Sequence, residues 1–335
     1  MSQPATHVIA IGNAIVDVMA PCADTLIAQL GLVRGGMTLV DTARAQELYD
    51  AMGPAREISG GSAANTLAGL AALGSRCAFI GQVADDQLGE VFAHDIRAGG
   101  ISFATPARAA TGDNAAPTAR CLIFVTPDGQ RTMNTYLGAS QFLPAAALDE
   151  AAIAAAEILY LEGYLWDPEE PRAAMRRAIA AARNAGRKVA FTLSDAFVIA
   201  RHGDDFRALI NAGEIDILFA NHVELAALTG HDDLHAGIAT LKHKVPLLIV
   251  TRGELGAVAV RGDAYHEVPA EPVANVVDTT GAGDLFAAGF LHALVGGRPL
   301  DDCLTLGAVC AAEIISHYGA RPEADLRQLA ARRLG

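Results

Sequence analysis

The chain has 335 residues, of which 52% are hydrophobic and 19% charged. This composition supports a large folded core and argues against intrinsic disorder, and the length allows two domains or one large α/β domain with an appendage. The formal net charge of −13 argues against nucleic acid or an anionic membrane as a partner.

The five cysteines form no CxxC pair, and the ten histidines form no HExxH motif. We therefore expect neither a disulfide framework nor a zinc site. No segment approaches the roughly 20 apolar residues of a membrane span, and residues 1–12 lack the features of a signal peptide. These features predict a cytoplasmic protein.

Short apolar runs alternate along the chain with longer Ala/Leu-rich helical patterns. The runs predicted to be strands are 7–12, 77–81, 158–163, 188–193, 215–220 and 246–251. Predicted helices between them include 62–73, 86–98, 171–185, 222–229 and 234–242, and the chain is mostly helical from Leu285 onward. Apolar strands separated by helices predict βαβ units and a parallel sheet buried on both faces.

Two segments, 13–41 and 101–137, break this alternation. Within the second, the apolar run 121–125 and the run 131–136 flank Pro127-Asp128-Gly129, a combination typical of a hairpin turn. Strands without intervening helices predict a small β appendage, and such appendages often act as lids over a site on the main sheet.

Polar residues lie within or beside the first apolar segments. Asn13 and Asp17 interrupt the run 11–20, and a carboxylate is costly to bury without a partner, so Asp17 is either a solvated edge position or a ligand contact. Gly60 and Gly61 precede the predicted helix 62–73, as at an ordinary helix start. Asn65 lies inside this helix although Asn is a weak helix former, and its amide can both donate to and accept from a ligand hydroxyl.

Two later strands are each followed by residues that have a purely structural explanation. After the strand 215–220, Asn221 is a good N-cap, and Glu224 is its natural capping-box partner. After the strand 246–251, Gly253 and Gly256 indicate a turn toward the next strand.

Two carboxylates flank a run of very small residues in VVDTTGAGDLFAAGF (276–290). Gly281, Ala282 and Gly283 lie at a turn into a predicted helix, where unpaired N–H groups and the helix dipole favour an anion. Asp278 and Asp284 could be helix caps, but one cap suffices for a helix. A carboxylate beside an anion site can instead accept a proton from an attacking hydroxyl, while the N–H groups stabilise a transferring phosphoryl group.

This segment resembles the C-terminal signature of the ribokinase-like (phosphofructokinase-B, PfkB) family of carbohydrate and nucleoside kinases. The D-T-x-G-A-G-D pattern is highly specific, and the resemblance runs from Ile11 to about Ala320 with all motifs in family order. It implies that Asp284 is the catalytic base and that Gly281, Ala282 and Gly283 line the anion hole.

The resemblance also implies a fold and a division of the chain. The fold is a three-layer α/β/α sandwich with a mostly parallel central sheet and a small β-sheet lid. The core would comprise 1–12, 42–100 and 138–335, and the lid 13–41 and 101–137.

Further motifs imply contacts with the two substrates. The residues implied around the acceptor are Asn13, Asp17, Gly35, Gly36, Gly60, Gly61 and Asn65. Those implied around ATP are Asn221, Glu224, Thr251, Gly253, Gly256, Asp278 and Gly319. The family pattern places Mg²⁺ at Asn221 and Glu224, through water, and a monovalent cation such as K⁺ near Asp278.

The segment FTLSDAFVIARH (191–202) resembles the L-S-x-P-F motif of adenosine kinases, in which Ser and Phe approach the nucleoside. Ser194 and Phe197 match, whereas Ala196 replaces Pro and Asp195 is unusual. A bare sugar offers no π-face, so a Phe placed here favours a base, unless Phe197 is an ordinary core residue. Arg131 resembles the lid Arg of adenosine kinases and would clamp the acceptor or the γ-phosphate, unless it is a solvated hairpin charge.

The sequence therefore predicts a kinase that transfers the γ-phosphoryl group of Mg·ATP to the 5′-hydroxyl of a nucleoside, with adenosine preferred and AMP and ADP as products. A ribokinase- or fructokinase-like sugar kinase and a kinase of another purine nucleoside stay open, as does a non-catalytic sensor on the same scaffold. A dinucleotide-dependent dehydrogenase lacks support, because no GxGxxG turn follows the first strand, and the absence of a Gly-Lys pair excludes a P-loop enzyme. The partner is a small molecule, and the chain is either a monomer or a homodimer formed through the lid.

Overall fold

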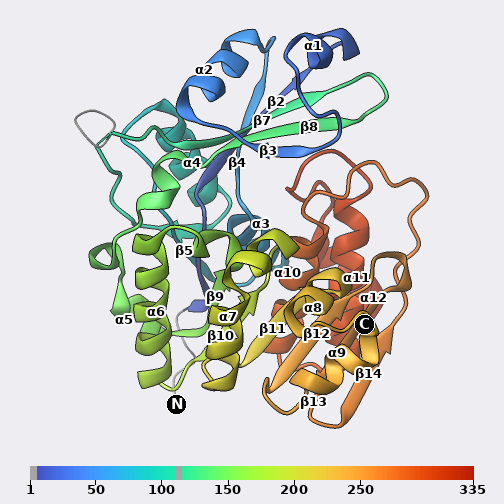
Figure 1. Cartoon of the computed structure of the whole chain (residues 1–335). Helices are drawn as coiled ribbons and strands as arrows, with labels where there is room; N and C mark the ends of the chain where they lie inside the picture. Colours follow the sequence, from blue (N-terminus) through green and yellow to red (C-terminus); the bar gives the residue numbers. More distant parts are fainter. Residues whose placement is uncertain (1–5, 110–114) are drawn as a thin grey trace.

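The computed structural model describes residues 6–109 and 115–335, which form two β-sheets of unequal size (Figure 1). The larger sheet has nine strands in the order β14-β13-β12-β11-β10-β9-β1-β5-β6. Its strands are β1 (Thr6–Ile11), β5 (Cys77–Ile80), β6 (Ile101–Phe103), β9 (Ala156–Glu162), β10 (Lys188–Thr192), β11 (Ile217–Asn221), β12 (Leu247–Thr251), β13 (Ala257–Arg261) and β14 (Ala264–Val268). Neighbours are parallel except along β12, β13 and β14. The predicted parallel sheet is confirmed.

Both faces of the larger sheet are buried. Along β1, Val8 and Ala10 belong to one hydrophobic cluster and Ile9 and Ile11 to a second, because successive side chains of a strand point to opposite faces. Helices α3 (Ser62–Leu73), α4 (Gln87–Ala98), α10 (Ala282–Val295), α11 (Leu300–Ile314) and α12 (Leu326–Leu334) contribute to the first cluster. Helices α5 (Glu150–Ala155), α6 (Glu169–Asn184), α7 (Ala196–Asn211), α8 (His222–Thr229) and α9 (Leu234–Leu241) contribute to the second. The three-layer α/β/α sandwich is therefore confirmed.

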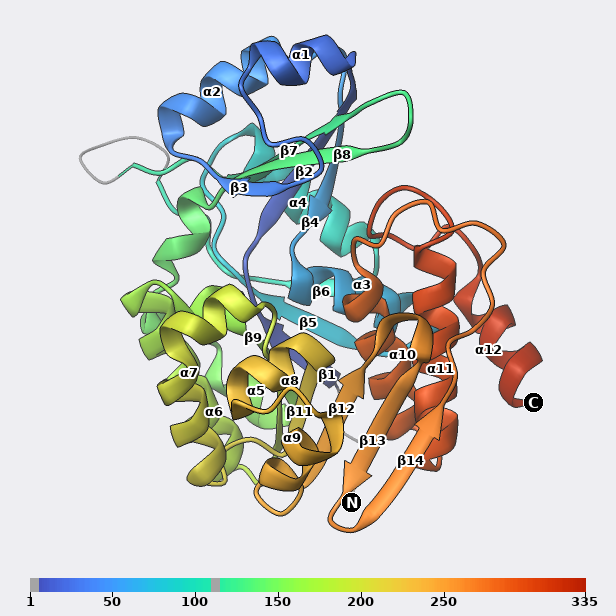
Figure 2. The same cartoon turned by 45° about the vertical axis from the view of Figure 1, so that its right-hand side comes forward.

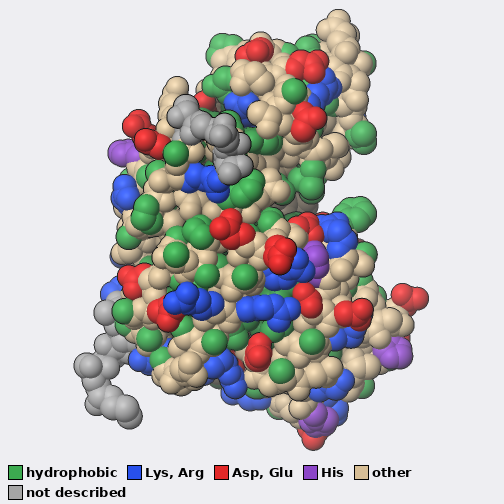
Figure 3. Space-filling model, turned by 60° about the vertical axis from the view of Figure 1, so that its left-hand side comes forward, with side chains coloured by type: hydrophobic (Ala, Val, Ile, Leu, Met, Phe, Trp, Pro, Cys, Tyr) green, Lys and Arg blue, Asp and Glu red, His purple; other side chains and the backbone are tan. Residues whose placement is uncertain are grey.

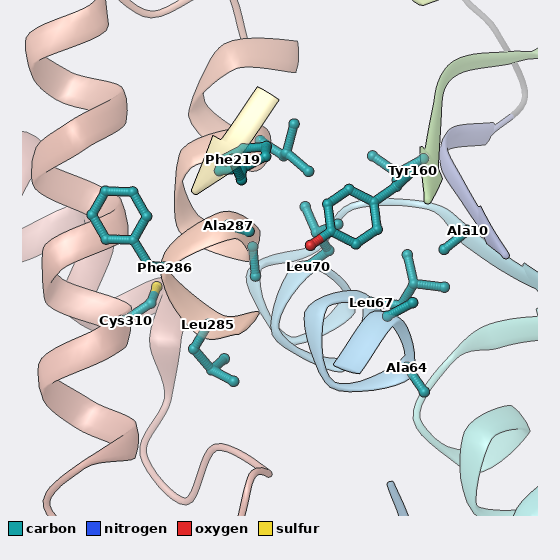
Figure 4. Packing of buried hydrophobic residues seen from close by; sticks show 14 of the residues in the cluster. Ala10, Ala64, Leu67, Leu70, Tyr160, Phe219, Leu285, Phe286, Ala287 and Cys310 are labelled. Atoms are coloured by element: carbon teal, nitrogen blue, oxygen red, sulfur yellow. The ribbon is translucent and has the colours of Figure 1, made fainter. Parts of the chain in front are cut away.

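Helices α3 and α10 pack unusually closely. Figure 4 shows Leu70 of α3 and Leu285 of α10 in one cluster with Phe219 of β11. A Cβ atom at Gly69 would lie 2.5 Å from Leu285 Cδ1 and 2.7 Å from Ala288 Cβ, so only glycine lets the two helices approach this far. The contact fixes the N-terminus of α3 relative to the N-terminus of α10.

The smaller sheet has five strands in the order β3-β8-β7-β2-β4. They are β2 (Ile15–Pro21), β3 (Met37–Leu39), β4 (Arg56–Gly60), β7 (Ala119–Val125) and β8 (Arg131–Tyr136). Strands β7 and β8 pair antiparallel across the predicted turn, with Val125 opposite Arg131, which confirms the hairpin. Helices α1 (Asp24–Gln29) and α2 (Thr42–Ala51) lie beside this sheet, which is set above α3 in Figures 1 and 2.

Strand β4 belongs to the smaller sheet although it lies within 42–100, a range expected to belong to the core. It pairs antiparallel with β2, whose other edge pairs with β7. Without β4, the backbone groups on one edge of β2 would have no partner in the sheet. The division of the chain into core and lid otherwise stays a prediction.

Charged side chains of both signs are interspersed on the face shown in Figure 3. Ion pairs that are at least partly exposed to solvent include Arg176–Asp205 at 3.1 Å and Arg183–Asp216 at 3.3 Å. Among the described residues, no helix is both long enough and apolar enough to cross a bilayer.

Candidate active site

The N-termini of α3 and α10 both begin at glycines with a left-handed backbone. The φ angle is 97° at Gly61 and 79° at Gly281, the N-cap residues of the two helices, and residues with a Cβ rarely adopt such angles. Neither glycine offers a side chain to the first-turn N–H groups. The N–H of Ala63 in α3 donates to a carboxylate, Glu162, and the N–H of Ala282 in α10 donates to the carbonyl oxygen of Thr279 at 3.2 Å. The N–H groups of Gly281 and Gly283 remain available to an anion. A Cβ at Gly283 would meet no atom within 4 Å, which leaves open space beside the turn.

Asp284, in the first turn of α10, is held by two donors from α3. Ser62 Oγ donates to Asp284 Oδ1 at 2.6 Å, and Asn65 Nδ2 donates to Asp284 Oδ2 at 3.0 Å. Burial raises the pKa of Asp284, and the bonds from Ser62 and Asn65 oppose that rise. The site thus holds an oriented carboxylate with raised basicity, as a general base requires.

The helix-cap interpretation of the two aspartates is wrong. Asp284 accepts hydrogen bonds from α3 side chains, and the N-cap of α10 is Gly281. Asp278 accepts from the backbone N–H groups of Thr280, at 3.1 Å, and Gly319, at 3.2 Å. Asp278 therefore links the residues that precede α10 to the C-terminal segment around Gly319.

Asn65 keeps one half of its amide free. The residue is 6% exposed, and its Oδ1 has no hydrogen-bond partner, which is costly in a folded protein unless a ligand or water fills the place. An oxygen in this position can accept a hydrogen bond from a hydroxyl bound near Asp284.

Asp17 lies on β2, between β4 and β7. A Cβ at Gly60 would lie 2.5 Å from Asp17 Oδ2, so the carboxylate rests directly on the glycine that precedes α3. Burial raises the pKa of Asp17 to about 6, against the opposing charges of Arg321 and Arg131. The solvated-edge interpretation is wrong, because β2 has a neighbour on each side.

Both amide atoms of Asn13, Nδ2 and Oδ1, have protein partners. Its backbone N and its Nδ2 each donate to Glu162 Oε1 at 2.7 Å, and Ser140 Oγ donates to Asn13 Oδ1 at 2.8 Å. Glu162 Oε2 in turn accepts from the N–H of Ala63 at 2.7 Å. The Glu162 carboxylate therefore links the loop between β1 and β2 to the first turn of α3.

Glu162 was not identified from the sequence. It ends the apolar strand β9 and is fully buried, and burial raises the pKa of its carboxyl to about 7. A Glu that closes an otherwise apolar strand of a parallel sheet was the available signal, since ligand sites form at the carboxyl ends of such strands. Ser62, interpreted as part of a helix start, was also missed as a partner of Asp284.

Ser194 and Phe197 lie where β10 gives way to α7. Ser194 has φ 70°, a strained value for a non-glycine residue and one that clusters at functional sites. Its Oγ accepts from the N–H of Tyr164 at 3.3 Å. Phe197 is 73% exposed, so the interpretation as an ordinary core residue is wrong.

Arg131 of β8 forms a buried ion pair with Asp278. The distance from Nη1 to Oδ2 is 2.8 Å, and the two side chains are 6% and 7% exposed. The guanidinium also lies 5.1 Å from the ring centre of Tyr318. The solvated-charge interpretation is wrong, and the pair ties the smaller sheet to the segment that leads into α10.

Asn221 and Glu224 form the capping box at the start of α8. Glu224 N–H donates to Asn221 Oδ1 at 2.8 Å, and Asn221 N–H donates to Glu224 Oε2 at 3.0 Å. Burial raises the pKa of Glu224 to about 7. Asn221 pairs in register with Thr251 at the carboxyl ends of β11 and β12, so both residues share one edge of the sheet.

The donor chemistry at this edge suits magnesium held with a nucleotide. The described residues contain no group of three or more His, Cys, Asp or Glu that could bind a metal by themselves. Magnesium commonly takes one or two carboxylates and completes its shell with phosphates and water. Glu224 and Asn221 fit that pattern.

The predicted residues Gly35, Gly36, Gly253 and Gly256 lie in two further segments, the start of β3 and the turn after β12. Gly253 and Gly256 shape the turn after β12, with φ 60° and 82°. In the smaller sheet, Gly35 N–H donates to Thr132 Oγ1 at 3.1 Å, and the carbonyl oxygen of Gly36 accepts from the N–H of Met133 at 2.9 Å. The structure gives both lid glycines partners in β8.

Comparison with protein families gives one extended match. Residues 27–326 match the family described as pfkB family carbohydrate kinase. A fructokinase of Klebsiella pneumoniae is 31% identical over 284 residues, which cover 82% of this chain and 91% of the relative.

Two solved structures resemble this chain over nearly its whole length. One, described as a "probable sugar kinase protein" of Rhizobium etli, has a TM-score of 0.90 at 42% identity and covers 98% of this chain and 99% of that one. The other, an adenosine kinase of Sinorhizobium meliloti, has a TM-score of 0.89 at 46% identity with the same coverage of 98% and 99%.

Proposed function

Since this chain belongs to the pfkB family of carbohydrate kinases, and is thus a phosphotransferase with an alcohol acceptor, we propose that it phosphorylates the 5′-hydroxyl of adenosine with ATP. The observation that carries the chemistry is Asp284, held by Ser62 and Asn65 beside the uncapped N-terminus of α10. A non-catalytic sensor would have no use for a base in this position.

The first step proposed is deprotonation of the acceptor. Asp284 accepts the proton of the acceptor hydroxyl as the hydroxyl oxygen attacks the γ-phosphorus of ATP. The bond between that phosphorus and the β,γ-bridging oxygen breaks, and ADP leaves. The bonds from Ser62 and Asn65 keep the carboxylate in one orientation, so little reorganisation is needed at the moment of transfer.

The second element is charge stabilisation at the glycine turn. The N–H groups of Gly281 and Gly283 face the transferring phosphoryl group, where the helix dipole and the open space beside Gly283 favour an anion. The N–H of Ala282, which donates to the carbonyl oxygen of Thr279 at 3.2 Å in this structure, would join them by exchanging that bond for one to the phosphoryl group. Magnesium, when bound with ATP, would neutralise phosphate charge, and Asn221 and Glu224 would hold it through water. No step is assigned to a monovalent cation, because Arg131 already neutralises Asp278.

The third element is the set of hydrogen bonds that binds the acceptor. The free Oδ1 of Asn65 and the Asp17 carboxylate are placed to accept hydrogen bonds from ribose hydroxyls. Asn13 already bonds Glu162 through Nδ2 and Ser140 through Oδ1, and we assign it the task of orienting the start of β2.

Adenosine is proposed as the acceptor on two grounds. Phe197, exposed next to the strained Ser194, offers a π-face that a purine can use and a bare sugar cannot. The adenosine kinase of Sinorhizobium meliloti shares 46% of its residues with this chain.

A sugar is the second candidate acceptor. The fructokinase of Klebsiella pneumoniae and the Rhizobium etli protein described as a probable sugar kinase are 31% and 42% identical to this chain. The alternative would leave the roles of Asp284 and the glycine turn unchanged and reassign only the acceptor.

The deciding experiment measures ADP release from ATP and magnesium with adenosine, inosine, guanosine, ribose or fructose as the acceptor. We expect adenosine to give the highest kcat/KM. Turnover of fructose or ribose without turnover of adenosine would overturn the acceptor assignment. If none of the five acceptors led to release of ADP, the proposal of catalysis would lose its support.

A further inference from the structure

Arg321 lies where the C-terminal segment meets the first turn of α3. Its Nη2 donates to the carbonyl oxygen of Ser59 at 2.6 Å and to Ser59 Oγ at 3.0 Å, and its Nη1 donates to the carbonyl oxygen of Ala64 at 3.1 Å. Burial lowers the pKa of Arg321 to about 10, so the guanidinium stays charged at neutral pH. The sequence motifs assign this residue no task.

The three bonds bracket the turn that carries the partners of the base. Ser59 precedes the Gly60–Gly61 pair, and Ala64 lies in the first turn of α3. Between them is Ser62, and directly after them is Asn65, the two residues that donate to Asp284. A guanidinium fixes both ends of such a turn at once, because its planar fork presents several donors in a fixed geometry.

Ser59 is also held from its other side. Its N–H donates to Asp95 Oδ2 of α4 at 3.1 Å, while its carbonyl and hydroxyl oxygens accept from Arg321. The residue that leads into the glycine pair is therefore immobilised by an anion and a cation from two distant parts of the chain.

The positive charge of Arg321 lowers the pKa values of two carboxylates of the site. It opposes the rise that burial imposes on the pKa of Asp17 and of Asp284. Arg321 also interacts electrostatically with Asp95. Arg131 of β8 acts on Asp17 as well, whereas Asp278 and Asp284 push its pKa upward. Asp284 in turn raises the pKa of Glu162.

We propose that Arg321 is the positioning residue for the acceptor side of this site. It fixes the Gly60–Gly61 turn, so that Ser62 and Asn65 stay aligned with Asp284, and it supplies a positive charge that favours the ionised forms of Asp17 and Asp284. The inference rests on the proposed function, in which Asp284 is the base.

The test compares Arg321→Gln with Arg321→Lys in the full-length enzyme. Loss of hydrogen bonds from a charged donor predicts that Arg321→Gln raises the acceptor KM about tenfold. Loss of the positive charge raises the pKa of Asp284, so the acidic limb of the kcat profile should move to higher pH. Arg321→Lys keeps the charge without the fork, so it should leave the acidic limb in place and raise the acceptor KM by a smaller factor.

Arg327→Gln is the matched control. Arg327 also donates to a carbonyl oxygen of α3, from Nε to Ala72 at 3.2 Å, but at the far end of that helix and exposed to solvent. We expect neither the acceptor KM nor the acidic limb to change in this variant. Thermal unfolding of all variants shows whether any loss of activity follows from a loss of folded protein.

The inference is overturned if Arg321→Gln keeps the acceptor KM and acidic limb of the wild type, or if Arg327→Gln changes both equally. Should Arg321→Gln not fold, Arg321→Lys decides: a raised acceptor KM with an unmoved acidic limb supports the inference, and an unchanged acceptor KM refutes it.

All kinetic measurements and pH profiles use the acceptor that the wild-type enzyme turns over. A wrong acceptor assignment is therefore seen in the wild type, and a wrong role for Arg321 is seen only in its variants.

Discussion

Asp284 has the position and the partners of a general base, and its replacement tests that role directly. Asp284→Asn removes the proton acceptor but retains a side chain of the same shape, so we expect kcat to fall by about a hundredfold or more while the acceptor KM changes little. Steady-state ADP release measures both. Asp204→Asn, at a fully solvated position on α7, should leave both constants unchanged. Near-normal kcat in Asp284→Asn would rule out the base assignment.

Asp17 couples the stability of the fold to pH. Its pKa is about 6 in the folded chain and about 4 in an unfolded one, so its ionisation destabilises the folded state as pH rises through 6. Below both values the group is protonated in either state, and its effect disappears.

Asp17→Asn should therefore increase the free energy of unfolding at pH 7.5, and this gain should shrink toward pH 5. Urea unfolding of wild type and variant at both values measures the difference between them, so contributions from other titrating groups cancel. The acceptor KM of the variant should rise at pH 7.5, because a ribose hydroxyl loses a charged partner. A gain in stability that grows as the pH falls would contradict the pKa assigned to Asp17.

The helices and strands could be predicted where the sequence pattern is local. The runs 158–163 and 246–251 coincide closely with β9 and β12, because a strand buried on both faces needs consecutive apolar residues. Strand β4 was missed because Arg56–Gly60 is short and polar and acquires its structure by pairing with β2.

The same limit applies within the site. The turn 281–283 could be predicted because a helix N-terminus built from small residues is a local feature. The partners of Glu162 and Arg321 could not be predicted, since these bonds join residues 99 to 262 positions apart in the chain.

The contact between α3 and α10 predicts a cost for added volume at Gly69. In Gly69→Ala the new methyl group would overlap Leu285 and Ala288, and overpacking of this kind costs about 1–3 kcal/mol. The helices must separate, which also moves Ser62 and Asn65 away from Asp284, so kcat should fall more than thermal stability alone explains. Steady-state kinetics on fully folded protein measures this.

Gly203→Ala is the control for the change of residue type. Gly203 lies in the middle of α7, and a Cβ there would meet the flexible end of Arg207 at 3.2 Å. Alanine stabilises a helix interior relative to glycine by about 0.5–1 kcal/mol, so this variant should unfold at the same or a higher temperature with unchanged kcat. Equal losses of kcat in both variants would show that the α3–α10 spacing does not matter for catalysis.

A buried ion pair joins the smaller sheet to the segment that leads into α10. Arg131 comes from the smaller sheet, while Asp278 precedes α10 and also accepts from Gly319. The pair holds the smaller sheet over the glycine turn, where it can exclude water from the phosphoryl group. A kinase that admitted water there would hydrolyse ATP.

Breaking this pair should therefore loosen the smaller sheet and uncouple ATP use from phosphorylation. Arg131→Leu leaves the Asp278 carboxylate buried without its partner, at a cost of about 3–5 kcal/mol, which the chain relieves by exposing that carboxylate to water. Backbone amides of β7 and β8 should then exchange hydrogen faster, and ADP release without an acceptor should rise. Asp278→Leu, which leaves Arg131 buried without its partner, should act in the same direction.

The double variant Arg131→Leu with Asp278→Leu separates the ion pair from other effects of these residues. Replacing both charges by apolar side chains removes the buried unpaired charge, so hydrogen exchange in β8 should return toward the wild-type rate. Hydrogen–deuterium exchange on the two single variants and the double variant gives the coupling between the residues. If exchange in β7 and β8 is the same in the wild type and in both single variants, the ion pair does not hold the smaller sheet in place, and water exclusion must depend on the substrates themselves.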